Sequence, residues 1–125
     1  MIGQTTILEK SAKAGAAITA YTIAKYGGDD DTLVPGVASG DSLIGVFQHN
    51  ADIGKEVRVM LLGISRVKAG GNIALGDLLT SDANGLAVAI GAVAGTNYNS
   101  IGRALASGAA NDIIPVLLPP SRPQG

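Results

Sequence analysis

The residues of this chain that could do chemistry are few and lie far apart in the sequence. His49 is the single histidine, and it sits beside a predicted turn. Acid–base catalysis by an imidazole needs a second group that orients it, and any histidine-based triad would depend on this one residue. We therefore interpret His49 as a surface side chain.

Residues 65–68 spell S-R-V-K, which matches the S-x-x-K nucleophile motif of penicillin-recognising enzymes. The K-T-G motif that supports that nucleophile is absent, and 125 residues are few for that fold. We treat the match as coincidence. No G-x-G-x-x-G or phosphate-loop lysine motif occurs either, so the usual backbone cradle for a nucleotide is missing.

Two acidic stretches could hold a hard cation through carboxylate oxygens. The run Asp29–Asp31 lacks further spaced ligands, and we interpret it as a hydrated loop. The stretch Asp82–Gly85, D-A-N-G, resembles the beginning of a calcium loop, but the position of that loop's bidentate glutamate holds Val93. A turn explains the stretch better, because Asn and Gly tolerate the positive φ of tight reversals. We predict no metal, no cofactor and no catalytic residue, and hence no enzyme.

The charges are balanced and indicate no electrostatic partner. Nine basic and ten acidic residues leave a formal net charge of -1, so we expect neither nucleic acid nor a membrane surface as a partner. The longest apolar run, 86–94, is much shorter than the ~20 residues that cross a bilayer, and no signal-peptide pattern is visible. Four cations surround the predicted central strand, where we expect them to prevent edge pairing or to form weak ion pairs: Lys55, Arg58, Arg66 and Lys68.

The composition predicts the scaffold that must position these side chains. The 125 residues suffice for one domain, and 18 glycines with 3% aromatic residues require frequent turns and a core of small aliphatic side chains. Cysteine is absent, which leaves no disulfide and is compatible with synthesis in a reducing cytoplasm. These features are typical of an all-β domain of many short strands.

Alternation of apolar and polar residues predicts the individual strands. Residues 1–13 develop no apolar helical face, and we expect them to form an extended N-terminal arm. The clearest alternation, over 55–64, predicts a central strand with Val57, Val59 and Leu61 inward and Met60 outward. Pro115 cannot donate a backbone hydrogen bond, which predicts an edge or bulge position for its strand. Other strands are predicted over 17–25, 43–47, 101–106 and 112–118, with two short ones within 68–90 and a Pro-rich, extended tail over 121–125.

A repeat organises the chain. Ala14-Gly15-x-x-Ile18 matches Ala69-Gly70-x-x-Ile73 at an offset of 55, and residues 57–61 lie over residues 114–118 at an offset of 57. We interpret the chain as two copies of a β unit, about 14–66 and 69–120, within a single domain over 14–120. Neither copy could bury a stable core alone, so the repeat predicts one barrel-like or clip-like body with internal pseudo-twofold symmetry.

The same residues resemble a known family. The segments A-G-A-A-I-T-A-Y-T-I-A-K, A-S-G-D-S-L-I-G-V, A-D-I-G-K-E-V-R-V-M-L-L-G and A-G-G-N-I-A-L-G-D-L-L-T-S-D-A-N-G occur in this order. Across residues 14–118 the chain is similar to the capsid decoration, or cement, proteins of tailed bacteriophages. The A-G-G-x-I-x-x-G-D element also resembles the turn pattern of β-clip domains. The resemblance implies a small β-clip protomer that forms homotrimers on the outer capsid surface of the virion.

The expected function is therefore structural. The resemblance implies a protein that binds the mature phage head and stabilises the expanded shell by bridging major capsid protein subunits. It also implies an N-terminal arm that pairs with the capsid protein, and the residues expected to add a strand to that partner are Ile2, Gln4, Thr6, Ile7 and Leu8. The alternative is a carbohydrate-binding or tail-associated β module, which the shortage of aromatic residues disfavours.

Overall fold

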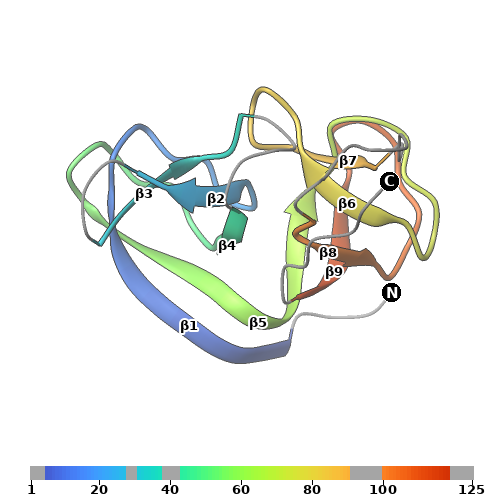
Figure 1. Ribbon diagram of the computed structural model, residues 1–125, viewed down its shortest axis with the longest axis horizontal. Coiled ribbons are helices and arrows are strands. Elements are labelled where there is room, and N and C mark those ends of the chain that lie inside the picture. Colours follow the sequence, from blue (N-terminus) through green and yellow to red (C-terminus); the bar gives the residue numbers. More distant parts are fainter. Residues whose placement is uncertain (1–4, 28–30, 38–42, 91–99, 119–125) are drawn as a thin grey trace, which may run out of the picture.

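The chain folds as one mixed β-sheet. The computed structural model describes residues 5–27, 31–37, 43–90 and 100–118, and no helix occurs among them (Figure 1). The predicted all-β class is confirmed. The nine strands of the described residues are β1 (Thr5–Ala14), β2 (Ile23–Tyr26), β3 (Thr32–Pro35), β4 (Leu43–Phe47), β5 (Glu56–Lys68), β6 (Leu78–Ser81), β7 (Ala87–Ala89), β8 (Gly102–Ala104) and β9 (Ile113–Leu118).

Five of these strands close into a ring. The sheet order is β1-β3-β2-β4-β5-β9-β8-β6-β7, and an additional pairing joins β1 to β5. The strands β1, β3, β2, β4 and β5 therefore form the ring, while β9, β8, β6 and β7 continue the sheet from the C-terminal half of β5. In Figure 1, β5 crosses the molecule from one group of strands to the other, and β1 runs beside it along the outer rim.

Two groups of buried side chains form the core. The first draws on all five ring strands and consists of Ala12, Ala14, Ile18, Ala24, Leu33, Phe47, Val57 and Val59. The second joins residues from both ends of the chain: Ile23, Leu43, Val46, Met60, Val67, Ala69, Ile73, Leu79, Ala87, Ile101, Ala104, Ile114, Val116 and Leu118. Because the second group needs side chains from both groups of strands, the ring and the remaining strands are packed as one body.

The strand β5 is shared by the two groups. The predicted central strand over 55–64 is confirmed, and it extends to Lys68 with β1, β4 and β9 as its neighbours. Val57 and Val59 are buried as predicted. The outward position predicted for Met60 is wrong, because this side chain is 0% exposed and packs in the second core group.

An irregularity in β5 explains why simple alternation fails there. Met60 and Val67 share a core group, although residues an odd number apart face opposite sides of a regular strand. Gly63 lies between them with a φ of 122°, a conformation that favours glycine. Close to it, the β1–β5 register shifts between Leu8 and Glu9, whose partners Leu62 and Met60 leave Leu61 as an extra residue in β5. The shift turns over the second half of β5, so both Met60 and Val67 face the same core.

The segment before β2 differs from the expected strand over 17–25. The strand begins only at Ile23, and Ile18 makes an isolated bridge to Ala51. The hydroxyl of Thr22 donates to the carbonyl of Thr19 at 2.7 Å, and Tyr21 has a positive φ of 65°. Such local side-chain to backbone bonds favour a turn over a strand, which is why the alternation misled the prediction.

The N-terminal segment also differs from expectation. Residues 5–14 form β1, which pairs antiparallel with β5 from Thr5 to Lys13 and parallel with β3 at Lys13 and Ala14. The predicted arm over 1–13 therefore does not match β1, because this ladder and the burial of Ala12 hold the segment in the sheet. Residues 1–4 and the predicted tail over 121–125 lie outside the described residues.

Pro115 lies inside the sheet, so the predicted edge or bulge position is wrong. Its strand β9 pairs with β5 on one side and β8 on the other, with Pro115 opposite Arg66. The β8–β9 pairing covers only Leu117 and Val116, and the carbonyl of Pro115 accepts from the N–H of Leu105 at 2.9 Å. The proline nitrogen thus faces the end of the β8–β9 ladder. The sheet therefore loses at most one terminal hydrogen bond of that ladder because proline has no N–H.

Candidate functional site

His49 has both ring nitrogens in local hydrogen bonds. Its Nε2 accepts from the backbone N–H of Arg58 at 3.1 Å, and its Nδ1 lies 2.9 Å from the carbonyl oxygen of Asn50. A ring nitrogen that faces a carbonyl must hold the proton, which assigns the neutral Nδ1–H tautomer. The imidazole thereby attaches the segment after β4 to β5.

Ser65 and Lys68 do not form a nucleophile and base pair. They are three positions apart in β5, so their side chains lie on opposite faces of the strand. Ser65 is buried, and its hydroxyl donates to the carbonyl of Arg66 and accepts from Nε2 of Gln48, both at 3.0 Å. A buried hydroxyl with these partners cannot reach a substrate, which agrees with reading the S-x-x-K match as coincidence.

The stretch Asp82–Gly85 forms the turn between β6 and β7, as predicted. One carboxylate oxygen of Asp82 accepts from the N–H of Asn84 at 2.8 Å and of Leu86 at 3.0 Å. Gly85 has the positive φ, 76°, that the reversal requires. The carbonyl of Gly85 also accepts from the N–H of Ile23 at 2.8 Å, which ties this turn to β2. The carboxylate is therefore used in shaping the turn.

The described acidic residues are dispersed. Among them no three His, Cys, Asp or Glu side chains gather into a group that could hold a metal ion. Asp31 lies 3.4 Å from Lys10 in a solvent-exposed ion pair, a type that contributes little to stability. Asp29 and Asp30 lie outside the described residues.

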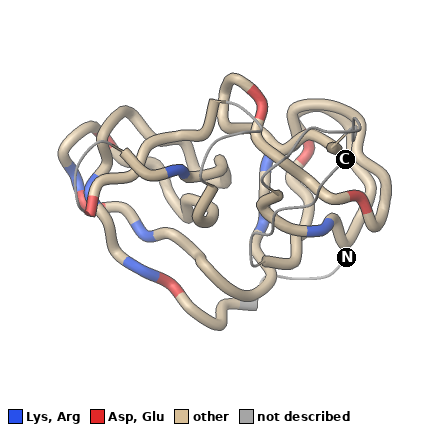
Figure 2. Tube along the Cα trace, in the orientation of Figure 1, with Lys and Arg blue, Asp and Glu red and all other residues tan. Residues whose placement is uncertain are grey.

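The cations around β5 do not form one basic patch. Lysine and arginine positions are spread over both groups of strands in Figure 2. Lys55 directly precedes β5 and Lys68 is its last residue, so they lie ~40 Å apart along the chain at ~3.3 Å per residue. Arg58 and Arg66 lie between them and are exposed. In the described part of the chain, no helix has the length and apolarity needed to cross a membrane.

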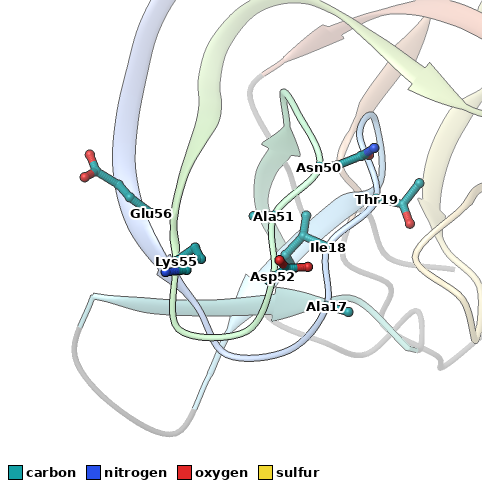
Figure 3. Close-up of a pocket in the computed structure, with 8 residues that line it drawn as sticks. All are labelled: Ala17, Ile18, Thr19, Asn50, Ala51, Asp52, Lys55 and Glu56. Carbon is teal, nitrogen blue, oxygen red and sulfur yellow. The ribbon is translucent and has the colours of Figure 1, made fainter.

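A hollow of about 530 Å³ lies where the loop before β2 meets the turn between β4 and β5 (Figure 3). Asn50 extends towards the loop that contains Thr19, and its Oδ1 accepts from the N–H of Ala20 at 2.7 Å. The side chain of Glu56 points away from the other lining residues in Figure 3. The polar groups do not converge as they do in a ligand site. The lining consists of Ala17, Ile18, Thr19, Asn50, Ala51, Asp52, Lys55 and Glu56.

Three of the predicted partner-binding residues lie at the exposed start of β1. They are Thr6, Ile7 and Leu8, and the two aliphatic side chains are 71% and 46% exposed. Ile2 and Gln4 lie outside the described residues. Exposed aliphatic side chains of this size at a strand end are suited to contact with another protein.

An aliphatic strip continues from this point across the sheet. Leu8 of β1 pairs with Leu62 of β5, and Ile64 of β5 pairs with Leu117 of β9. Leu117 is 45% exposed, while Leu62 and Ile64 are half-buried. We call Ile7, Leu8, Leu62, Ile64 and Leu117 the aliphatic strip.

Sequence reasoning missed the hollow and the place of β1 at the rim of the ring. The sequence signal for β1 is weak, because only two buried positions, Ala12 and Ala14, alternate with the exposed Ser11 and Lys13. Alanine is a poor indicator of a strand. A longer apolar residue at either position would have made the alternation visible.

Comparison with known proteins places the whole described chain in one group. The model of a family described as phage cement protein matches residues 2–118. Among solved structures, the chain is similar to the N base of the head fiber gp8.5 of bacteriophage phi29, with a TM-score of 0.66 and 23% sequence identity. That match covers 90% of this chain and 93% of the phi29 chain, and at this identity it shows a shared fold. No curated protein sequence matches the chain significantly.

Proposed function

Because the chain belongs to the phage cement protein family, we propose that it binds the outer surface of the mature phage head and stabilises the expanded shell by bridging major capsid protein subunits. The family match over residues 2–118 is the observation on which this proposal rests. The family is structural, so the chain is not an enzyme, and its place is on the head surface of the virion.

The mechanism is selective binding. A cement protein that binds the expanded lattice and not its precursor shifts the equilibrium towards the expanded state by mass action. A protomer that contacts two neighbouring subunits binds more tightly than one contact allows, because the second contact forms at a high effective concentration. A stiff body suits this task, and the packing of both strand groups around shared core residues supports it.

We further propose that the binding unit is a homotrimer. A trimer would supply three copies of each surface to sites where several capsid subunits meet. The aliphatic strip supports self-association, because it brings exposed aliphatic side chains together on three adjoining strands. Light scattering should give the mass of three chains at micromolar concentration, and a stable monomer would contradict this part of the proposal.

Residues 1–4 together with the start of β1 remain our proposed capsid-binding segment: Ile2, Gln4, Thr6, Ile7 and Leu8. The exposure of Ile7 and Leu8 supports this assignment. Ile7→Ser should lower occupancy on heads without a change in the thermal unfolding midpoint, because the side chain is largely in solvent in the free protein. Unchanged occupancy would remove Ile7 from the binding segment.

A duplicated β unit of the β-clip type is the architecture we propose for the body. The strand registers support it. Ile23 pairs with Val46 in the ring, and Leu78, 55 positions after Ile23, pairs with Arg103, 57 positions after Val46. Likewise Ala12 pairs with Val57, and Val67 pairs with Ile114 at the same offsets, while isolated bridges join Ile18 to Ala51 and Ile73 to Gly108. These offsets are those found in the sequence repeat.

The experiment that tests the proposed function is a binding assay on two kinds of shell. Heads of the parent phage that lack this chain are prepared in the precursor and the expanded form, and purified protein is added to each. Saturable co-sedimentation with expanded heads and none with precursor heads is expected. Absence of binding to expanded heads would contradict the proposal.

A further inference from the structure

We propose that the outer edge of β1, at Glu9 and Ser11, is a docking site for an extended strand of the shell subunit. The inference rests on the proposed function and adds to it the surface that is used and the form of the partner segment. In this arrangement β1 lies between β5 and the added strand, and main-chain hydrogen bonds hold the partner.

The hydrogen bonds of β1 show which backbone groups point outward. The N–H of Ala14 donates to Lys55, which precedes β5, at 2.8 Å, whereas the N–H of Lys13 points the other way and donates to Asp31 at 2.7 Å. Backbone groups alternate between the two edges of a strand, and the register with β5 is regular from Glu9 to Lys13. The N–H groups of Ser11 and Glu9 therefore point away from β5.

Among the described residues, no strand lies beside these outward groups. The only strands of the described residues that pair with β1 are β5 and β3, and β3 reaches only Lys13 and Ala14. Figure 1 shows β1 on the outer rim, with β5 on its inner side. Unpaired N–H and C=O groups on a strand edge are a template for another strand.

The central strand shows how a comparable edge is occupied. At Gly63 and Ile64, β5 has β1 on one edge and β9 on the other. Within the part of the chain that the structure describes, the corresponding stretch of β1 has a partner on one edge only. A strand added at Glu9 and Ser11 would give β1 the two-sided pairing that β5 already has.

The C-terminal end of β9 lies away from this edge, because Leu118 pairs with Gly63 on the edge of β5 opposite β1. The proposed function supplies an occupant, since a cement protein contacts the subunits of the shell.

A second copy of this chain is the less suitable occupant. Two β1 edges could pair with each other only around a twofold axis, which the proposed threefold assembly does not contain. The other strand at the end of the sheet order, β7, has three residues and offers a short ladder. An extended segment of the shell subunit remains.

The side chains along the edge indicate the chemistry of that segment. Ile7 and Leu8 at one end favour an aliphatic residue opposite them, because the contact removes their exposed surface from water. Further along the strand the charges are balanced locally, because Lys10 lies 3.4 Å from Asp31 and Lys13 stands opposite Glu56 of β5. We infer an extended segment with an aliphatic residue at the end that meets Ile7 and Leu8.

Residue-resolved amide exchange tests this directly. The wild-type protein is exchanged free and bound to expanded heads, then released and read by NMR. The amides of Glu9 and Ser11 should exchange at least ~10-fold more slowly in the bound state, because each gains a hydrogen bond. The amides of Lys10 and Ala12, which face β5, should be protected in both states.

Ser11→Pro provides a second test. It removes the outward N–H and no β1–β5 bond, so the thermal unfolding midpoint should stay near that of the wild type while affinity for heads falls by ~10-fold. Ala83→Pro is the matched control, since Ala83 is an exposed turn residue remote from β1, and it should bind as the wild type does.

The outcomes separate the two proposals. Wild-type protein that does not bind expanded heads contradicts the proposed function itself. Wild-type binding with unchanged exchange at Glu9 and Ser11, and with full affinity of Ser11→Pro, leaves that function in place and overturns the docking site. Protection of the same two amides in free protein, rising with concentration, would assign the edge to a second copy and also overturn the inference.

Discussion

At the scale of single residues, Gly85 occupies a backbone conformation that residues with a side chain rarely adopt. Its φ is 76°, and a Cβ built there would lie 3.2 Å from Cβ of Pro35. Gly85→Val should lower the free energy of unfolding by ~2 kcal/mol or more, because a β-branched residue is strained at positive φ and the site is buried. Urea unfolding followed by circular dichroism measures the loss.

Gly71→Ala is the control for this prediction. No positive φ applies at Gly71, and the nearest atom to a built Cβ is Cγ1 of Val88 at 4.0 Å. Its stability should change by no more than ~0.5 kcal/mol. Equal stability of Gly85→Val and the wild type would show that the turn tolerates other conformations and would contradict the account of the β6–β7 hairpin.

Residue types in the sequence predicted local backbone conformation better than they predicted which residues form hydrogen bonds with each other. The D-A-N-G pattern predicted the turn at Asp82, since the tolerance of Asn and Gly for positive φ is a local property. The partners of His49 and Ser65 are Arg58 and Gln48, which are nine and seventeen positions away. No spacing rule connects residues that meet only when β4 lies beside β5.

At the scale of elements, β1 should be essential for the fold. Deletion of residues 1–12 removes most of the strand that closes the ring and exposes Val57 and Val59 of β5. We expect loss of the cooperative thermal unfolding transition, because the ring loses part of its core along with its ladder. Circular dichroism on heating measures this.

Deletion of residues 1–4 is the matched control, because it leaves every described strand pairing in place. This variant should unfold cooperatively near the wild-type midpoint. If the longer deletion also unfolds cooperatively at that temperature, residues 5–12 are a dispensable arm and the role assigned to β1 is wrong.

Strands with strong alternation were predictable, and weaker or irregular ones were not. The prediction over 43–47 coincides with β4, and the strand over 55–64 lies within β5 apart from its first residue. The sequence did not predict that the Met60 side chain faces the core, since the register shift near Gly63 depends on the pairing of β5 with β1. The segment at Thr19–Thr22 alternates as a strand would, yet a local hydrogen bond makes it a turn.

At the scale of the whole molecule, the two sequence repeats should not fold separately. The second core group combines Ile23, Val46 and Met60 with Val67 and Ile114, so each half lacks side chains that the other supplies. Fragments 1–66 and 67–125 should each give the circular dichroism of unfolded chains. A cooperative transition in either fragment alone would show that one unit is self-sufficient.

The closure of the ring by the pairing of β1 with β5 could not be predicted from the sequence. The repeat indicated two related units, but the pairing of β1 with β5 joins residues about 50 positions apart and leaves no local pattern. The open outer edge of β1 is a consequence of that closure. A docking surface of this kind is visible only once the strand order is known.

The central claim is that this protein strengthens the phage head, and it is tested by the heat resistance of filled heads with and without the chain. Heads that lack the protein are heated, and DNA release is followed with a dye; purified protein is then added back before a second series. We expect the release temperature to rise with occupancy and to saturate when the surface sites are filled. Full occupancy with no change in the release temperature would contradict the claim.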